Sequence, residues 1–234
     1  MRKWLGAIAI LLLSAATVVE TQRGGRDAGP GGGGRGGGGG GFNGPVAGHG
    51  VEVPGWWARM DDPAMAMKSG LKFAPVNNTN IQATTGGASG IFWDPNQSGS
   101  GKYTVKARFT LSKVPANQEP FGLFIGGQDL SADSQRYTVF ALRPDGRYLI
   151  TRRTGAKTMN VGGDWVDHAA VMKAAGGKMA NELSVQVAGN TVTFMANGKT
   201  VATHPSSAVD AGGVAGLRLG RSLDVLVEGF ALEQ

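Results

Sequence analysis

One short segment combines acidic, aromatic and imidazole side chains, the sequence Asp164-Trp165-Val166-Asp167-His168. Aspartate and histidine serve both as metal ligands and as proton carriers, so Asp164, Asp167 and His168 are weak candidates for catalysis. No second His or Glu stands beside them at the spacing of metal ligands, which favours a polar loop with a solvated histidine. The sequence therefore leaves the catalytic residues unknown and predicts no metal site.

A second set of side chains has the chemistry of sugar recognition. Indole faces stack on the apolar C–H faces of sugars, and planar arginine forks bind the hydroxyl groups. The candidate ligand-binding residues are Trp57, Trp93, Tyr137, Arg143, Arg152, Arg153 and Trp165. Core packing is the alternative for each aromatic residue, and it is stronger for Trp56 and Trp93 than for Trp165.

Short strands must position these side chains, because apolar and polar residues alternate along residues 51–234. The segment 103–111 places an apolar residue at every second position, which is typical of a half-buried strand. Further strands are predicted at 137–142, 147–153, 183–187, 192–194, 214–219 and 224–232. Only 169–180 has a helix-like composition, and Gly176-Gly177 interrupts it.

Turn residues separate these strands at the spacing of hairpins. Pro144-Asp145-Gly146 and Gly189-Asn190 each reverse the chain, and Asn197-Gly198 is the strongest hairpin signal because both residues tolerate positive φ. Without crossover helices a parallel α/β fold is excluded. The pattern predicts an all-β domain, a two-sheet antiparallel β-sandwich or jelly roll.

The N-terminal residues have a different character. Residues 1–16 combine Arg2 and Lys3 with an apolar run and a small-residue cleavage site near Ala16, as in a cleavable signal peptide. Residues 17–50 are expected to form a disordered Gly-rich linker, since 16 of the 40 glycines lie within 24–50. These features predict a secreted or periplasmic protein, with one domain at 51–234 and no membrane span in the mature chain.

Composition excludes several functions. There is no cysteine, which removes disulfides, thiolate chemistry and a lipid-anchor residue. Half of the net charge of +6 lies in residues 1–50, and the basic residues of 51–234 are scattered, so nucleic acid is not an expected partner. No cofactor is implied; calcium is possible but not indicated, and the oligomeric state is unknown.

The order of elements over residues 52–234 resembles a known superfamily. Two strands around Gly189-Asn190 lead to Asn197-Gly198, then to a Gly-x-x-Gly-Leu-Arg strand at 213–218 and a final strand at 225–232. This is similar to the concanavalin A-like lectin/glucanase superfamily, in particular its laminin-G-like members. With Gly55-Trp56-Trp57 and Gly90-Ile91-Phe92-Trp93 included, it most resembles bacterial secreted domains related to the 3-keto-disaccharide hydrolase family.

The resemblance implies a fold but leaves the activity open, because the superfamily contains lectins, glycosidases and adhesion modules. The glucanase members carry Glu-x-Asp-x-Glu on one strand, whereas Glu119, Glu182 and Glu228 here stand alone. The leading hypothesis is an exported, lectin-like domain that binds carbohydrate or a cell-surface glycan. The alternatives are a glycoside hydrolase acting on a keto-sugar or other disaccharide, and a laminin-G-like protein adhesion module.

Overall fold

A computed structural model describes residues 50–62 and 70–234. The expected signal peptide, residues 1–16, and the expected linker, residues 17–50 except Gly50, lie outside the described residues. Within the described part, no helix is long and apolar enough to cross a membrane.

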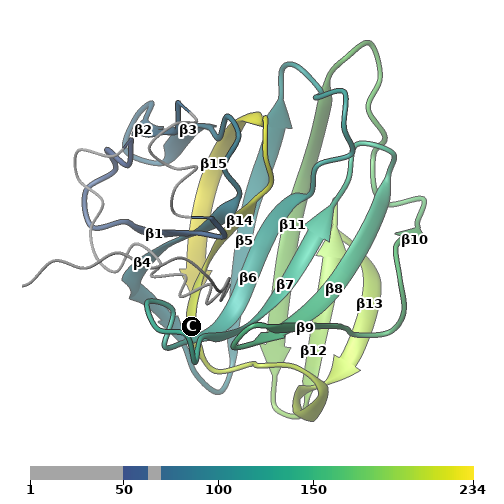
Figure 1. The fold of residues 1–234 in the computed structure, drawn as a ribbon. Helices are drawn as coiled ribbons and strands as arrows, with labels where there is room; N and C mark the ends of the chain where they lie inside the picture. Colours follow the sequence, from purple (N-terminus) through teal and green to yellow (C-terminus); the bar gives the residue numbers. More distant parts are fainter. Residues whose placement is uncertain (1–49, 63–69) are drawn as a thin grey trace, which may run out of the picture. The chain divides into compact units, whose positions relative to one another are not determined.

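Strand pairing divides the described chain into two antiparallel sheets (Figure 1). The eight-stranded sheet has the order β1-β4-β14-β6-β7-β8-β10, and β9 also pairs with β8. Its strands are β1 (Trp57–Met60), β4 (Gly90–Gly99), β6 (Phe121–Gln128), β7 (Arg136–Leu142), β8 (Arg147–Thr154), β9 (Lys157–Asn160), β10 (Val166–Asp167) and β14 (Gly213–Leu219).

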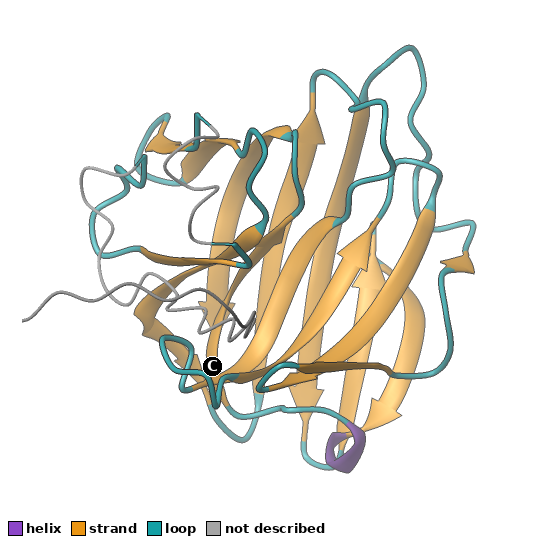
Figure 2. Ribbon diagram, in the orientation of Figure 1, coloured by secondary structure: helices purple, strands orange, loops and turns teal. Residues whose placement is uncertain are grey.

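The seven-stranded sheet has the order β13-β12-β11-β5-β15-β3-β2. Its strands are β2 (Lys72–Pro75), β3 (Asn80–Thr84), β5 (Tyr103–Leu111), β11 (Met179–Ala188), β12 (Thr191–Ala196), β13 (Lys199–Pro205) and β15 (Asp224–Glu233). One short 3₁₀ helix, η1 (Ser206–Ala208), is the only helix of the described residues (Figure 2). The prediction of an all-β, two-sheet antiparallel sandwich is confirmed.

The alternating sequence of β5 explains its place in the sandwich. Every second residue from Tyr103 to Leu111 is buried, and β11 pairs with it in register, with Val185 opposite Val105. The hairpin between β12 and β13 turns at Asn197 and Gly198, whose φ angles of 50° and 74° are the positive values that the Asn-Gly pair tolerates. Sequence and geometry agree closely here.

The core between the two sheets is aromatic. Its largest fully buried rings are Phe73, Phe92, Phe109, Phe121, Phe140 and Phe194. The rings of Phe73 and Phe92 stack at 4.6 Å, and Phe140 meets Phe194 edge to face at 5.4 Å. Because these rings come from both sheets, they hold the sheets together and fix which face of each sheet points outward.

The segment with a helix-like composition forms no helix. Between β10 and β11 the chain runs through turns, and Ala175 bridges to Lys178 around Gly176-Gly177. Both glycines have positive φ, which an α-helix does not allow.

Candidate functional site

The outward face of the eight-stranded sheet carries a second apolar cluster, separate from the core. Buried side chains from β4, β6, the β6–β7 loop and β7 make up the cluster: Ile91, Trp93, Phe124, Leu130, Tyr137, Val139 and Ala141. Strand register explains the cluster, because one row of paired residues crosses the sheet on this face. The row consists of Trp93 on β4, Gly216 on β14, Phe124 on β6, Val139 on β7 and Thr151 on β8. The face is therefore apolar although it points away from the core.

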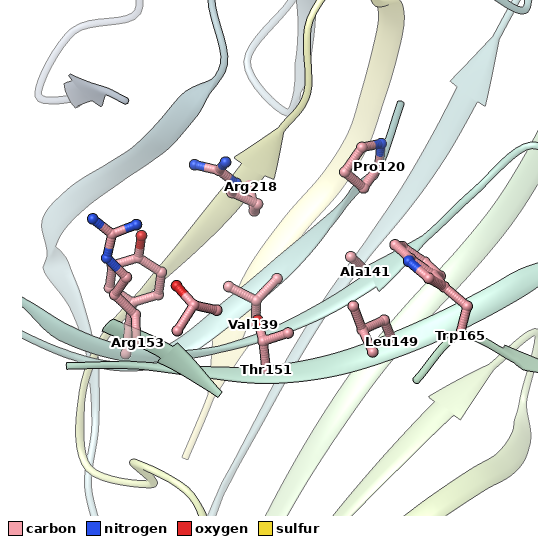
Figure 3. Close-up of a pocket in the computed structure, with 10 residues that line it drawn as sticks. Pro120, Val139, Ala141, Leu149, Thr151, Arg153, Trp165 and Arg218 are labelled. Atoms are coloured by element: carbon pink, nitrogen blue, oxygen red, sulfur yellow. The ribbon is translucent and has the colours of Figure 1, made fainter. Parts of the chain in front are cut away.

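A cleft of about 160 Å³ opens on this face. Its floor comes from alternate residues of β7 and β8, namely Val139, Ala141, Leu149 and Thr151. Figure 3 shows Trp165 at one end of the cleft, the side chains of Arg153 and Arg218 at the other, and Pro120 between them. Tyr137 and Thr158 complete the lining. An apolar floor with polar groups at one end is the usual composition of a small-molecule site.

Trp165 is held in place by Arg143. The residue directly precedes β10, which pairs with the edge of β8 through Val166 and Tyr148. The Arg143 guanidinium lies 4.4 Å from the centroid of the Trp165 ring, and it also forms an ion pair with Asp145. This cation–π contact fixes the ring beside the cleft. Arg143 thus contacts Trp165 but does not line the cleft.

The cationic end of the cleft contains two arginines, Arg218 in an ion pair and Arg153 without one among the described residues. Arg218 forms a two-point ion pair with Asp61, whose Oδ1 lies 2.8 Å from Nη1. Burial alone would raise the pKa of Asp61. Hydrogen bonds from Arg218 and the Ser89 hydroxyl, together with the positive charge of Arg218, lower the pKa by more than burial raises it, so the net pKa lies below its usual value. Arg153 donates from Nε to the carbonyl oxygen of Gly155 at 2.7 Å.

Tyr137 brings a hydroxyl group to the same end. Burial raises the pKa of its phenol, and the charges of Arg218 and Arg153 oppose that rise only in part. The hydroxyl therefore stays protonated at neutral pH and can donate a hydrogen bond to a ligand. Trp165, Tyr137 and Arg153 are thus brought together in one cleft.

Arg152 lies on the opposite side of the sheet from Arg153. Consecutive residues of a strand point to opposite faces, and Arg152 binds Asp210 through two hydrogen bonds of 2.9 and 3.0 Å. The Asp210 side chain is 6% exposed, and its backbone N–H donates to the buried hydroxyl of Thr138. Arg152 is engaged in this structural pair and does not line the cleft.

Trp57 and Trp93 form a separate hollow on the same face of the sheet. They lie opposite each other on β1 and β4, with ring centroids 6.3 Å apart. Pro95, Leu130 and Val214 are among the other residues that line this hollow. Trp57 and Trp93 therefore line a different hollow from Trp165.

The three weak catalytic candidates do not line the cleft either. Asp164 lines another hollow, together with His204, while Asp167 pairs with Lys173 at 3.0 Å. His168 accepts a hydrogen bond at Nδ1 from the Ala170 N–H, and its ring lies edge-on to Tyr148. No group of three metal-ligating side chains occurs among the residues that the structure describes.

Sequence reasoning named three of the ten residues that line the cleft, and Arg218 and Pro120 are among the seven that it missed. The signal for Arg218 was present, because it stands between Leu217 and Leu219, which are both fully buried, and so must point outward. Pro120 carries no such signal. It lies just before β6, and only the fold brings it beside Arg218.

Comparisons with known proteins identify the fold. No protein family model matches the chain, and no curated protein matches it. Among solved structures, the carbohydrate binding module CBM66 from Bacillus subtilis is similar with a TM-score of 0.54 at 11% identity, over 77% of this chain and 96% of that one. The chain therefore shares the two-sheet β-sandwich fold of that module.

Two further structures show weaker likeness. A Bacillus subtilis protein of unknown function with a galectin-like fold has a TM-score of 0.49 at 13% identity, covering 76% of this chain and 89% of that one. Sheep galectin-11, in complex with glycerol, has a TM-score of 0.41 at 17% identity, covering 58% and 92%. At these identities the likeness concerns the fold alone.

Proposed function

We propose that this protein is a lectin-like module that binds a glycan in the cleft between Trp165 and Arg153. The observation that carries the proposal is the composition of the cleft, an indole at one end, an apolar floor, and a guanidinium with a phenolic hydroxyl at the other. A sugar ring has matching parts, since its C–H face is apolar and its edge carries hydroxyl groups. The similarity in fold to a carbohydrate binding module supports this function.

The size of the site favours an oligosaccharide. The cleft of about 160 Å³ is smaller than a usual ligand pocket, but Pro120 and Arg218 also border a second hollow of about 500 Å³. Polar and charged side chains, Ser89 and Glu119 among them, line part of that hollow. A chain of two or more sugars can occupy both spaces, with one ring against Trp165.

A glycan array tests the proposal. The full chain is expected to bind a limited set of glycans, and Trp165→Ala is expected to weaken that binding at least tenfold at an unchanged melting temperature. Trp57→Ala is the matched control, because it removes a partly exposed indole from the other hollow of the same sheet. An array without any bound glycan would contradict the proposal and favour the protein adhesion module.

Hydrolysis of a keto-disaccharide is the enzymatic alternative. It needs a proton-abstracting group beside the keto carbon, and Asp164, Asp167 and His168 remain the residues to test. The wild-type protein would then turn over a 3-keto-disaccharide, and Asp167→Ala or His168→Ala would abolish this turnover. Binding of the disaccharide without turnover would contradict the hydrolase function and support the lectin-like function.

The proposal includes export and tethering. Residues 1–16 would be removed as a signal peptide, and residues 17–50 would link the sandwich to the mature N-terminus. Mass spectrometry of the protein secreted by an expression host tests this directly. A mature chain that begins near Ala16 is expected, and an uncleaved chain would contradict it.

A further inference from the structure

Among the described residues of the outward face, Arg153 differs from Arg59 and Arg218 in forming no ion pair with a carboxylate. Arg59 pairs with Asp133 at 3.0 Å, and Arg218 pairs with Asp61. Within the described residues no carboxylate pairs with Arg153, whose hydrogen bond is the one from Nε to Gly155. That bond orients the guanidinium and leaves Nη1 and Nη2 for a ligand in the cleft.

The cleft has a net positive charge at this end. Of the described residues that line it, Arg153 and Arg218 are charged and none is acidic. Asp61 neutralises Arg218, so one positive charge remains, and it lies on an apolar floor where water screens it less than at an open surface. An anionic group on a ligand would balance this charge.

We infer that the glycan ligand carries a carboxylate, as a hexuronic acid does, and that Arg153 binds this carboxylate. The inference rests on the proposed function and defines its ligand class. The two terminal N–H groups of a guanidinium are parallel and match the two oxygens of a planar carboxylate. The Tyr137 hydroxyl can donate a further hydrogen bond at the same end, while the C–H face of the sugar lies toward Trp165.

The second hollow limits where the acidic sugar can lie. Asp61, Asp62 and Glu119 line that hollow with Arg218 and Arg221, and Glu119 pairs with Arg221 at 3.2 Å. Both arginines of that hollow are already in ion pairs, Arg218 with Asp61 and Arg221 with Glu119, so neither is available to a carboxylate of the ligand. The acidic sugar is therefore expected at Arg153.

Matched oligosaccharides test this inference. Calorimetric titration of the full chain would use tetrasaccharides with a single glucuronic, galacturonic or mannuronic acid, each beside its carboxyl-reduced form, at 0.15 M salt. At least one acidic tetrasaccharide is expected to bind ten times more tightly than its reduced form. Arg153→Gln is expected to remove that preference, and Arg153→Lys to retain only part of it.

A control variant separates specific recognition from general attraction to a basic protein. Lys102→Gln removes the same charge from an exposed position that does not line the cleft, and it should leave the preference unchanged. Equal affinity for acidic and reduced forms would overturn the inference but leave the proposed function standing. A preference that persists in Arg153→Gln would overturn the role of Arg153, and an array without any bound glycan would overturn both proposals.

Discussion

The outward faces of the two sheets differ in how their side chains are satisfied. On the seven-stranded sheet, β5 and β15 form a ladder of partners, with Lys106 2.6 Å from Glu233 and Arg108 3.6 Å from Glu228. Thr110 donates to the same Glu228 carboxylate. On the eight-stranded sheet, the outward residues Tyr137, Val139 and Ala141 of β7 are buried in an apolar cluster, and Arg153 forms no ion pair within the described residues.

This difference is the reason for placing the proposed glycan site on the eight-stranded sheet. The charges of the ladder are already paired with one another and reached by water, so a ligand would gain little by binding there. An apolar floor beside a guanidinium without an ion pair, in contrast, is stabilised by a ligand that covers it. Both faces belong to one sandwich and rest on the same aromatic core. The difference therefore arises from the outward residues of the strands and not from the fold.

The largest expected effect comes from a charge placed on the apolar outward face. Val139→Asp should lower the free energy of unfolding by about 2–3 kcal/mol and abolish glycan binding, because Val139 is 7% exposed among apolar neighbours. Ser184→Asp, at an outward position of β11, should change stability by at most about 0.5 kcal/mol. Urea denaturation measures the free energy of unfolding of both variants. Equal losses of stability would contradict the proposed difference between the two outward faces.

Two adjacent arginines provide a sharper test of the eight-stranded sheet. Arg152→Gln should cost about 2 kcal/mol of stability, because it leaves the buried Asp210 carboxylate without its charged partner. Arg153→Gln should cost at most about 0.5 kcal/mol and should weaken ligand binding instead. Thermal unfolding should show a lower melting temperature only for Arg152→Gln, and calorimetric titration should show the weaker ligand binding for Arg153→Gln. Equal losses of stability and of binding in the two variants would contradict the assignment of Arg153 to the cleft.

These two positions also show what sequence could predict. Alternation predicted the strands and their hairpins, because one buried face imposes a period of two, as in β5 and β11. Arg152 and Arg153 were nevertheless both predicted as ligand-binding residues, although neighbouring residues of a strand face opposite sides of the sheet. On β7 all residues from Tyr137 to Leu142 are buried, so no alternation marked its outward face. The Asp61–Arg218 pair joins positions 157 residues apart, which only the fold brings together.

The Asp61–Arg218 pair should make stability depend on pH below neutrality. Because the pKa of Asp61 is lower in the folded state than its ordinary 3.8, the ion pair stabilises the fold above about pH 3.8, and this contribution is lost as the pH falls through the folded-state value. Asp61→Asn should therefore cost about 1 kcal/mol or less at pH 7, since the carboxylate is 38% exposed. The two stability curves should converge as the pH falls below the folded-state pKa of Asp61. A constant difference over pH 2–7 would contradict the ionic origin.

The smallest effect is expected on the seven-stranded sheet. Glu228→Gln removes the charge of an outward ladder residue, and it should change stability by less than about 0.5 kcal/mol and leave glycan affinity unchanged. Melting temperatures at low and high salt, together with a binding titration, check both points. A loss of binding in this variant would move the site to the other sheet.

The most direct test of the glycan site follows the indole N–H signals of a ¹⁵N-labelled protein during titration with a bound glycan. The signal of Trp165, assigned by its loss in Trp165→Phe, is expected to shift with saturation. The signal of Trp56, in the core against Phe73 and Phe230, is expected to stay in place. Saturable shifts confined to Trp57 and Trp93 would place the ligand in the other hollow and contradict the account.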